Sequence, residues 1–194
     1  MNQQKWWKGQ EGNNYTDRNR EMTGRIEMFA KLLMALPQFP HRILEVGANR
    51  GLNLTAINEI LNDSATLIGL EPNEIARHQI PFNSIDGVAQ NIPLDDDSVD
   101  LTFSCGVLIH IHPDELEQAC REIYRVSSKY IICIEYFSDK LEMITYQGKE
   151  NLLWKQDFGK LYMNLFPDLT LIDCRFFWKE ATGLDNVTAW VFEK

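Results

Sequence analysis

The residues best placed for chemistry lie at a turn between residues 43 and 52. The apolar run at residues 43–46 ends in a turn that contains Gly47 and Gly51, which is typical of a strand, a tight turn and a helix start. Both glycines tolerate positive φ and let a ligand approach the backbone closely. Asn49 lies between them, and asparagine is the residue other than glycine that best tolerates the left-handed region. The pattern predicts a nucleoside-type ligand that faces the first N–H groups of the next helix.

An acidic residue follows the second apolar run. Residues 66–70 read as a strand, and Glu71 comes directly after it. An acidic residue at this strand tip is positioned to bind both hydroxyls of an unphosphorylated ribose, although it could also be a solvated strand end. A nicotinamide-dependent oxidoreductase shares this geometry and is an alternative. Against it, the G-x-G-x-x-G spacing fails, because Gly47 is followed by Asn49 and Gly51.

These residues must be held by a sheet with helices. Strand patterns are expected at residues 42–46, 66–71, 83–86, 99–105 and 130–135, and helical patterns at 25–36, 52–61, 73–79 and from Pro113 onward. This alternation predicts an open, mostly parallel α/β sheet. Two further strand-like runs, at 169–178 and 186–193, are joined without a helix between them, so we expect them to be antiparallel neighbours.

Composition narrows the classes of partner. The chain has 194 residues and a net charge of −9, with no cluster of lysine or arginine, so no nucleic-acid partner is expected. No apolar run approaches the ~20 residues needed to span a membrane, and residues 1–6 lack the apolar core of a signal peptide. We therefore expect a cytoplasmic protein with no membrane partner.

The four cysteines do not suggest a disulfide or a metal site. Cys105, Cys120, Cys133 and Cys174 lie inside predicted elements, and none is paired at metal-ligand spacing. We expect buried, reduced thiols and no metal. No linker or repeat divides the chain, which predicts a single domain over 1–194. Its parts are an aromatic arm and leading helix (1–36), a cofactor-binding core (40–135), and an acceptor-side segment with the terminal strand pair (136–194).

Four ordered stretches together resemble a known family. They are residues 45–51 (Glu-Val-Gly-Ala-Asn-Arg-Gly), 71–73 (Glu-Pro-Asn), 86–90 (Asp-Gly-Val-Ala-Gln) and 99–104 (Val-Asp-Leu-Thr-Phe-Ser). This order is similar to that of class I S-adenosylmethionine-dependent methyltransferases, and residues 92–110 resemble their ubiquinone-type branch. The family usually has a glycine where this chain has Asn49. The resemblance implies S-adenosylmethionine as the cofactor. It also implies a Rossmann-like class I fold: a mostly parallel seven-stranded sheet with an antiparallel C-terminal strand and helices on both faces.

A narrower resemblance lies outside the core. Residues 7–19 and 153–160 are similar to methyltransferases associated with pseudaminic acid biosynthesis. This implies a small-molecule acceptor, a sugar or sugar-nucleotide used for a surface glycan of the nonulosonic acid type, with O- or N-methyl transfer. The sequence does not predict the oligomeric state.

The class I resemblance also assigns roles to residues. Glu45, Gly47, Ala48 and Asn49 should line the methionine end of the cofactor; Glu71 should bind the ribose, with Pro72 and Asn73 beside it; Val88, Ala89 and Gln90 should surround the adenine; Ser104, Cys105 and Gly106 should form the floor beneath the sulfonium.

The arm supplies two further candidates. Tyr15 is one of three aromatic residues, with Trp6 and Trp7, that either cover the site as a lid or anchor the arm to the core. Arg18 could meet the cofactor carboxylate as a bidentate ion pair, or it could be a solvated surface arginine.

A general base is needed only if the acceptor must lose a proton. His110 follows the fourth strand and is the first candidate, because an imidazole is partly neutral at pH 7. The alternative is a histidine that only orders its loop. Glu135, Tyr136 and Asp157 are secondary candidates, and His112 more plausibly begins a helix. A non-catalytic cofactor-binding partner subunit is also compatible with the sequence, since a fold does not by itself give activity.

Overall fold

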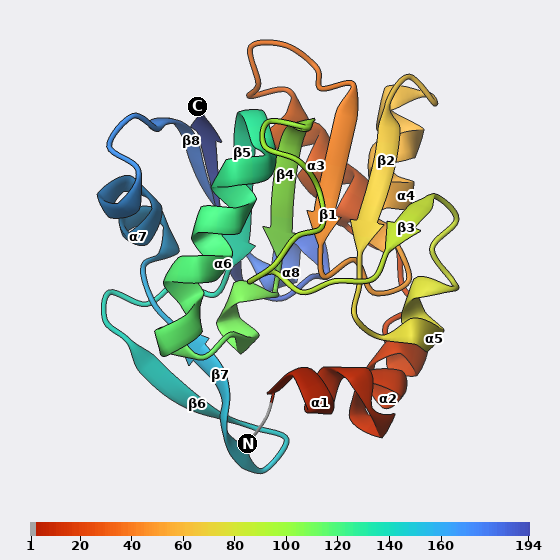
Figure 1. Cartoon of the computed structure of the whole chain (residues 1–194), viewed down its shortest axis with the longest axis vertical. Coiled ribbons are helices and arrows are strands. Elements are labelled where there is room, and N and C mark those ends of the chain that lie inside the picture. Colours follow the sequence, from red (N-terminus) through yellow and green to blue (C-terminus); the bar gives the residue numbers. More distant parts are fainter. Residues whose placement is uncertain (1–2) are drawn as a thin grey trace.

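A seven-stranded sheet forms the centre of the computed structural model, which describes residues 3–194 (Figure 1). The strands follow the order β3-β2-β1-β4-β5-β9-β8. Their bounds are β1 (Arg42–Val46), β2 (Thr66–Leu70), β3 (Asn83–Ile85), β4 (Val99–Cys105), β5 (Ser127–Glu135), β8 (Thr170–Phe177) and β9 (Val187–Glu193). The first five strands pair in parallel, and β9 is antiparallel to both β5 and β8. The expected mostly parallel sheet with an antiparallel C-terminal strand is confirmed.

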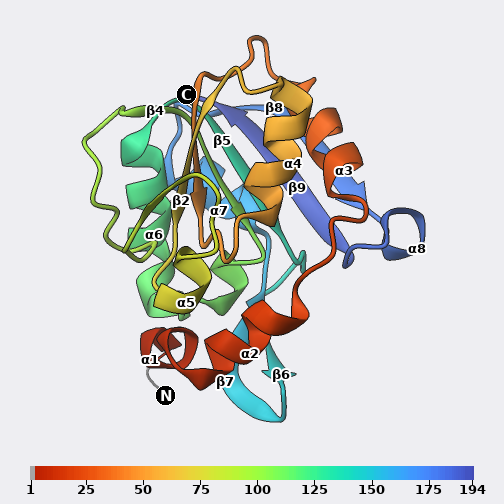
Figure 2. The ribbon, with the colours of Figure 1, turned by 90° about the vertical axis from the view of Figure 1, so that its right-hand side faces the viewer.

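Helices cover both faces of this sheet (Figures 1 and 2). On one face, α3 (Arg25–Leu33) and α4 (Leu52–Leu61) bury residues such as Phe29, Leu32 and Leu54 against alternate residues of the strands. On the other face, α6 (Pro113–Val126) and α7 (Phe158–Leu165) bury residues such as Ile123 and Tyr162. The central strands are therefore apolar on both faces, as parallel sheets require.

Two additions lie beyond the carboxyl ends of the parallel strands. The N-terminal arm folds into α1 (Gln3–Lys8) and α2 (Gln10–Arg18), and residues 142–155 form a hairpin of β6 (Glu142–Tyr146) and β7 (Lys149–Lys155). Figure 2 shows both additions at the same end of the molecule, below the sheet. The hairpin turn has positive φ at Gln147 and Gly148, the geometry of a two-residue type I′ turn. These additions close the edge at which an open α/β sheet binds its ligands.

Several elements differ from the sequence-based expectation. α3 ends at Leu33 rather than residue 36, and the helix expected over residues 73–79 is the short α5 (Glu74–Arg77). A four-residue helix, α8 (Lys179–Thr182), lies between β8 and β9, so the expectation of a helix-free connection was wrong. The antiparallel pairing of the two strands is confirmed.

The expectation of four buried cysteines was wrong for two of them. Cys120 and Cys133 are buried, but Cys105 is partly exposed and Cys174 is exposed, because Cys174 lies on the edge strand β8. All four thiols are free. Among residues 3–194, no helix combines the length and the apolar character needed to cross a membrane.

Candidate cofactor and acceptor site

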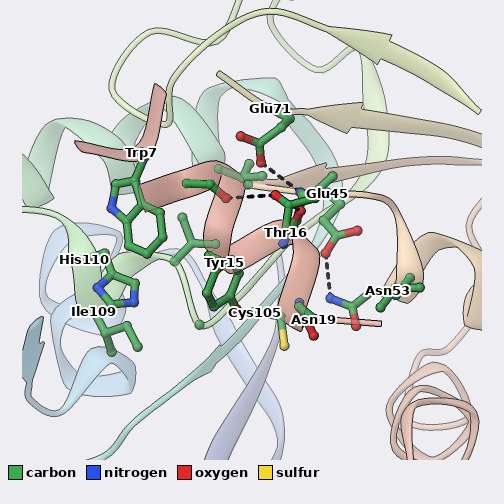
Figure 3. A pocket seen from close by; sticks show the side chains of 18 of the residues that line it. Trp7, Tyr15, Thr16, Asn19, Glu45, Asn53, Glu71, Cys105, Ile109 and His110 are labelled. Carbon is green, nitrogen blue, oxygen red and sulfur yellow. Dashed lines mark hydrogen bonds between the residues drawn. The ribbon is translucent and has the colours of Figure 1, made fainter. Parts of the chain in front are cut away.

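A cavity of about 490 Å³ opens beyond the carboxyl ends of β1, β2 and β4. This volume is in the range of small-molecule sites. Side chains from the arm, the glycine turn, the segment after β4 and the hairpin line it (Figure 3). The residues assigned to the cofactor come together here, with Ser104 as the exception; they are Tyr15, Arg18, Glu45, Gly47, Ala48, Asn49, Glu71, Pro72, Asn73, Val88, Ala89, Gln90, Cys105 and Gly106.

The turn after β1 has the backbone that its residue types predict. Gly47, Asn49 and Gly51 have φ angles of 71°, 49° and 79°. A Cβ atom at Gly47 would lie 2.6 Å from a methyl group of Val107, so this position needs glycine for space as well as for its φ. The turn leads directly into α4, whose first residues also line the cavity.

Glu71 is buried at the tip of β2 and holds the turn in place. One carboxylate oxygen accepts a hydrogen bond from Asn49 N–H (2.8 Å), and the other accepts one from Asn73 N–H (2.8 Å). Burial raises the pKa of Glu71, while these two backbone N–H groups oppose the rise. Each carboxylate oxygen has a further lone pair, so Glu71 can still accept hydrogen bonds from ribose hydroxyls.

Glu45 is the second buried acid of the site. Its Oε1 accepts a hydrogen bond from Asn53 Nδ2 (2.6 Å), and its Oε2 is buried without a partner among the described residues. Burial raises the pKa of Glu45 to about 8, although Asn53 and the nearby Arg25 lower it. Arg25 donates to Asn53 Oδ1 and to Asn19 Oδ1 (3.1 Å). The unpartnered Oε2 beside the cavity fits a ligand that brings its own donor, as the ammonium group of a methionine moiety would.

Three residues of this end were missed from the sequence. Asn53 of α4 donates to Glu45, and Arg25 of α3 donates to Asn53. The hydroxyl of Thr16 on α2 lies 2.8 Å from Asn49 Oδ1 in the glycine turn. Asn53 could have been found from its position, because it is the second residue of the helix that follows the glycines. Arg25 and Thr16 carried no such signal, because they come from segments whose packing the sequence did not predict.

The residues expected around the adenine occupy a loop between β3 and β4. Ala89 is buried, and Val88 bridges to Asn91. The side chain of Gln90 forms a hydrogen bond with α6, where its Nε2 donates to Glu115 Oε2 (2.7 Å). Ala89 and Val88 can pack against a ring, and Gln90 fixes the loop to α6.

The opposite end of the cavity is aromatic. His110 lies in a 3₁₀ turn, η1 (Leu108–His110), and its ring is 4.7 Å from the ring of Trp7 and 5.1 Å from that of Tyr146. Trp7 comes from α1 and Tyr146 from the hairpin. Tyr15 of α2 stands edge-on to Trp7 at 5.5 Å, and burial raises its pKa to about 12. In Figure 3 this end, with Trp7 and His110, lies across the cavity from Glu45 and Asn53.

The hydrogen bond of His110 fixes its tautomer. Its Nδ1 lies 2.6 Å from Leu152 O, and a carbonyl oxygen only accepts, so Nδ1 carries the proton. Nε2 therefore keeps its lone pair. Burial lowers the pKa of His110 to about 4, so the ring is neutral at pH 7.

Glu135 and Ser104 do not line the cavity. Ser104 Oγ donates to Glu135 Oε1 (2.9 Å), and the same carboxylate accepts hydrogen bonds from the N–H groups of Val107 (3.1 Å), Leu108 (3.0 Å) and Ile109 (3.3 Å). Burial raises the pKa of Glu135 to about 7, against these donors. Both residues lie behind the floor and hold the turn that carries His110. Glu135 is therefore better described as a positioning residue than as a base that contacts an acceptor.

The remaining candidates are distributed around the site. Asp157 lies outside the cavity lining and caps α7, where its side chain accepts from Lys160 N–H (2.9 Å). His112 is the N-cap of α6, as the sequence indicated. Tyr136 lines the cavity and donates to Asp185 Oδ2 (2.6 Å). Arg18 is exposed at the cavity mouth, whereas Arg25 reaches the buried Glu45 end.

Comparisons with known proteins agree with this geometry. Residues 44–133 match the profile of a family described as "Methyltransferase domain". The matched residues run from β1 to β5, and they include the strands β1, β2 and β4, beyond whose carboxyl ends the cavity opens. No curated protein matched the chain.

Three solved structures of similar fold come from different organisms. A Burkholderia thailandensis 1,6-didemethyltoxoflavin-N1-methyltransferase, crystallised with 1,6-didemethyltoxoflavin and S-adenosylhomocysteine, has a TM-score of 0.71 at 15% identity, over 94% of this chain and 83% of that one. A Leishmania major S-adenosylmethionine-dependent methyltransferase has a TM-score of 0.72 at 15% identity, over 98% and 81%. A Pyrococcus horikoshii protein has a TM-score of 0.66 at 17% identity, over 95% and 92%.

These likenesses establish the Rossmann-like class I fold. Together, the matched domain and the fold support a class I S-adenosylmethionine-dependent methyltransferase, with S-adenosylmethionine as its cofactor. The chemistry of the cavity agrees, because the buried Glu71 suits a ribose and the buried Glu45 suits an ammonium group.

Proposed function

We propose that this protein transfers a methyl group from S-adenosylmethionine to a small polar acceptor, a sugar or sugar-nucleotide of a surface-glycan pathway of the nonulosonic acid type. The observation that carries the proposal is the division of one cavity. The acidic Glu45 lies at one end, the aromatic rings around His110 lie at the other, and Glu71 lies between them (Figure 3). A cofactor held by the carboxylates would present its methyl group toward the aromatic end.

The aromatic end suits a sugar. A pyranose has apolar C–H faces and polar hydroxyl edges, and Trp7 and Tyr146 offer flat apolar surfaces with a polar atom at the rim. The similarity of residues 7–19 and 153–160 to methyltransferases associated with pseudaminic acid biosynthesis supports this class. Trp7 and Leu153, from those two segments, both line the cavity.

His110 is placed to accept a proton. With Nδ1 donating to Leu152 O, the lone pair of Nε2 is available to an acceptor hydroxyl or amine. A bound S-adenosylmethionine supplies a methyl group already activated by the positive sulfur. The protein then contributes mainly by positioning, which can lower a barrier by as much as ~7–11 kcal/mol. His110 removes the proton that the acceptor loses, and Glu135 holds the turn that carries His110.

The test has two stages. Calorimetry should show that S-adenosylhomocysteine binds and that NAD does not; NAD binding alone would favour the oxidoreductase alternative. The protein is then incubated with S-adenosylmethionine labelled in its methyl group and with fractionated sugar-nucleotides. Label should transfer to one fraction. Binding of S-adenosylhomocysteine with no transfer to any sugar or sugar-nucleotide would disprove the acceptor class and leave the cofactor assignment intact.

A further inference from the structure

One edge of the sheet is long and exposed. β8 is the last strand in the sheet order, and no described strand pairs with its outer side. It has eight residues, whereas β3 at the other edge has three. Natural edge strands are usually shortened or protected by charged residues, proline or bulges. The sequence of β8, TLIDCRFF, has no lysine or proline; its charged residues are Asp173 and Arg175, and its irregularity is confined to residues 171–173. Phe176 is 63% exposed on this strand, and Trp178 directly after it is 56% exposed.

The direction of the backbone groups of β8 follows from β9. Lys194 N–H donates to Lys129 O (2.7 Å) on the β5 side, so even-numbered residues of β9 bond to β5 and odd-numbered ones bond to β8. Asp173 pairs with Val191 and Arg175 with Ala189, so Asp173 and Arg175 bond to β9.

Cys174 and Phe176 therefore direct their N–H and C=O groups away from the sheet. The N–H of Cys174 agrees with this, because it donates to Asp173 Oδ1 (3.0 Å) rather than to β9. The outward groups can form hydrogen bonds with another strand, for which the N–H of Cys174 exchanges its bond to Asp173 for one to that strand.

We propose that a second copy of this chain pairs with β8, antiparallel and about a two-fold axis at Cys174, so that the two sheets become one. The outward backbone groups of one copy must meet those of the other, which restricts the register. An axis at Asp173 places Asp173 opposite its own copy, and an axis at Arg175 does the same for Arg175. Like charges directly opposite are destabilising.

The axis at Cys174 makes the charges complementary. Within one copy Arg175 pairs with Asp173. Across the axis, Asp173 of each copy faces Arg175 of the other, at a pair position without backbone bonds, where side chains approach most closely, so the two ion pairs meet with opposite charges opposed. An axis closer to the N-terminus of β8 falls within the irregularity between Leu171 and Asp173, and an axis closer to its C-terminus runs past the end of β8 at Phe177. An isologous contact of this kind closes as a dimer and does not propagate.

The same register brings the two Cys174 residues together. They form a backbone-bonded pair with Cα atoms about 5.5 Å apart, within the span of a disulfide. Phe176 lies on the same face of β8 as Cys174 and packs on the partner's strand across the axis. Part of the exposed surface of Phe176 is thereby removed from water.

The first experiment measures self-association of the full chain by sedimentation velocity over a range of concentrations. Wild type should form a dimer. Arg175→Asp places Asp opposite Asp at both symmetric positions and should weaken the dimer about tenfold or more. The double variant Asp173→Arg/Arg175→Asp restores opposite charges across the axis and should recover the dimer. Arg121→Glu on α6 reverses a charge away from β8 and should have no effect.

The second experiment identifies the register with a thiol oxidant. A covalent dimer should form in wild type and in Cys105→Ser, but not in Cys174→Ser. Circular dichroism shows whether each variant is folded. A monomer at every concentration, a dimer that Arg175→Asp does not weaken, or a covalent dimer that survives Cys174→Ser would each disprove the proposal.

Discussion

Glu71 combines two tasks at the residue scale. It holds the backbone of the glycine turn through Asn49 and Asn73, and its remaining lone pairs face the cavity. A charged hydrogen bond is worth about 1.5–3 kcal/mol, which corresponds to about 10- to 100-fold in affinity. Glu71→Ala should therefore weaken S-adenosylhomocysteine binding by at least about tenfold, measured by calorimetry.

The matched control is Glu27→Ala. Glu27 is exposed on α3, pairs with Lys31 (2.6 Å) and lies outside the cavity lining, so its loss should leave the affinity unchanged. Equal affinities of wild type and Glu71→Ala would show that Glu71 serves only the turn.

His110 separates proton chemistry from positioning. His110→Ala should lower kcat about 10²–10⁴-fold with little change in S-adenosylhomocysteine affinity, once the acceptor is known. The pKa of about 4 also predicts the pH dependence. The His110 ring is already neutral above pH 6, so the kcat of wild type should not fall as the pH is lowered from 8 to 6.

His112→Ala is the control for this prediction. It removes a helix cap and should cost stability, about 0.5–2 kcal/mol, while kcat is retained. If His110→Ala has a kcat within a few-fold of wild type, the reaction needs no base at this position.

The limits of sequence reading are clearest for single side chains. Gly47, Asn49 and Glu71 could be placed because a strand, a turn and a helix impose local rules on them. Asp157 was predicted as an acceptor-side candidate; in the structure it is the N-cap of α7, which its position before an apolar helical pattern also indicates. Arg25 could not be placed, because its contact with Asn53 depends on how α3 packs against α4.

At the scale of elements, the arm depends on close packing between α1 and α2. A Cβ atom at Gly12 would lie 1.9 Å from Trp7 O and 2.8 Å from Asn73 Nδ2. Asn73 Nδ2 also donates to Trp7 O (2.9 Å) and Asn13 Oδ1 (2.8 Å), so the same small region attaches the arm to the tip of β2. Gly12 is needed here for space and not for its φ.

Gly12→Ala should therefore detach the arm. We expect weaker binding of S-adenosylhomocysteine or of the acceptor, faster proteolysis within residues 3–18, and a core that stays folded, as for deletion of residues 1–20. Gln10→Ala, an exposed position on α2, should change none of these. Unchanged ligand binding in Gly12→Ala would mean that the arm has another purpose.

Elements with strong local signals were predicted well, and those stabilised by distant contacts were not. The bounds of β1, α4 and β4 agree with the sequence patterns, since each is an apolar or periodic run between turn residues. The β6–β7 hairpin was missed because it is attached by contacts with η1 and α1, such as His110 with Leu152 and Gln3 with Asn151, which lie far away in the sequence. Its one local signal was the Gln147-Gly148 pair at the turn.

At the scale of the whole molecule, the buried carboxyl groups and the buried histidine make the stability of the fold depend on pH in opposite directions. Glu45 and Glu135 have pKa values raised by burial to about 8 and about 7, above the ordinary carboxyl value, so folding favours their protonated forms. The pKa of His110 is lowered to about 4, so folding favours its neutral form. The carboxyl groups therefore contribute stability at low pH that is lost as pH rises through 7 and 8, and His110 contributes stability that is lost as pH falls below about 6.5.

Between pH 6 and pH 8 the two carboxyl groups dominate, because His110 is neutral in both states over most of this range. The melting temperature of the free protein should fall from pH 6 to pH 8, by an amount that reflects a few kcal/mol at most. Glu45→Gln should reduce this fall, because the amide does not ionise. S-adenosylhomocysteine, whose ammonium group favours the ionised Glu45, should raise the melting temperature more at pH 8 than at pH 6, and this difference should vanish in Glu45→Gln. Differential scanning fluorimetry at pH 6 and pH 8, with and without S-adenosylhomocysteine, measures the melting temperature of wild type and of Glu45→Gln. A free protein that melts higher at pH 8 would show that these carboxyl groups ionise at ordinary pH in the folded state.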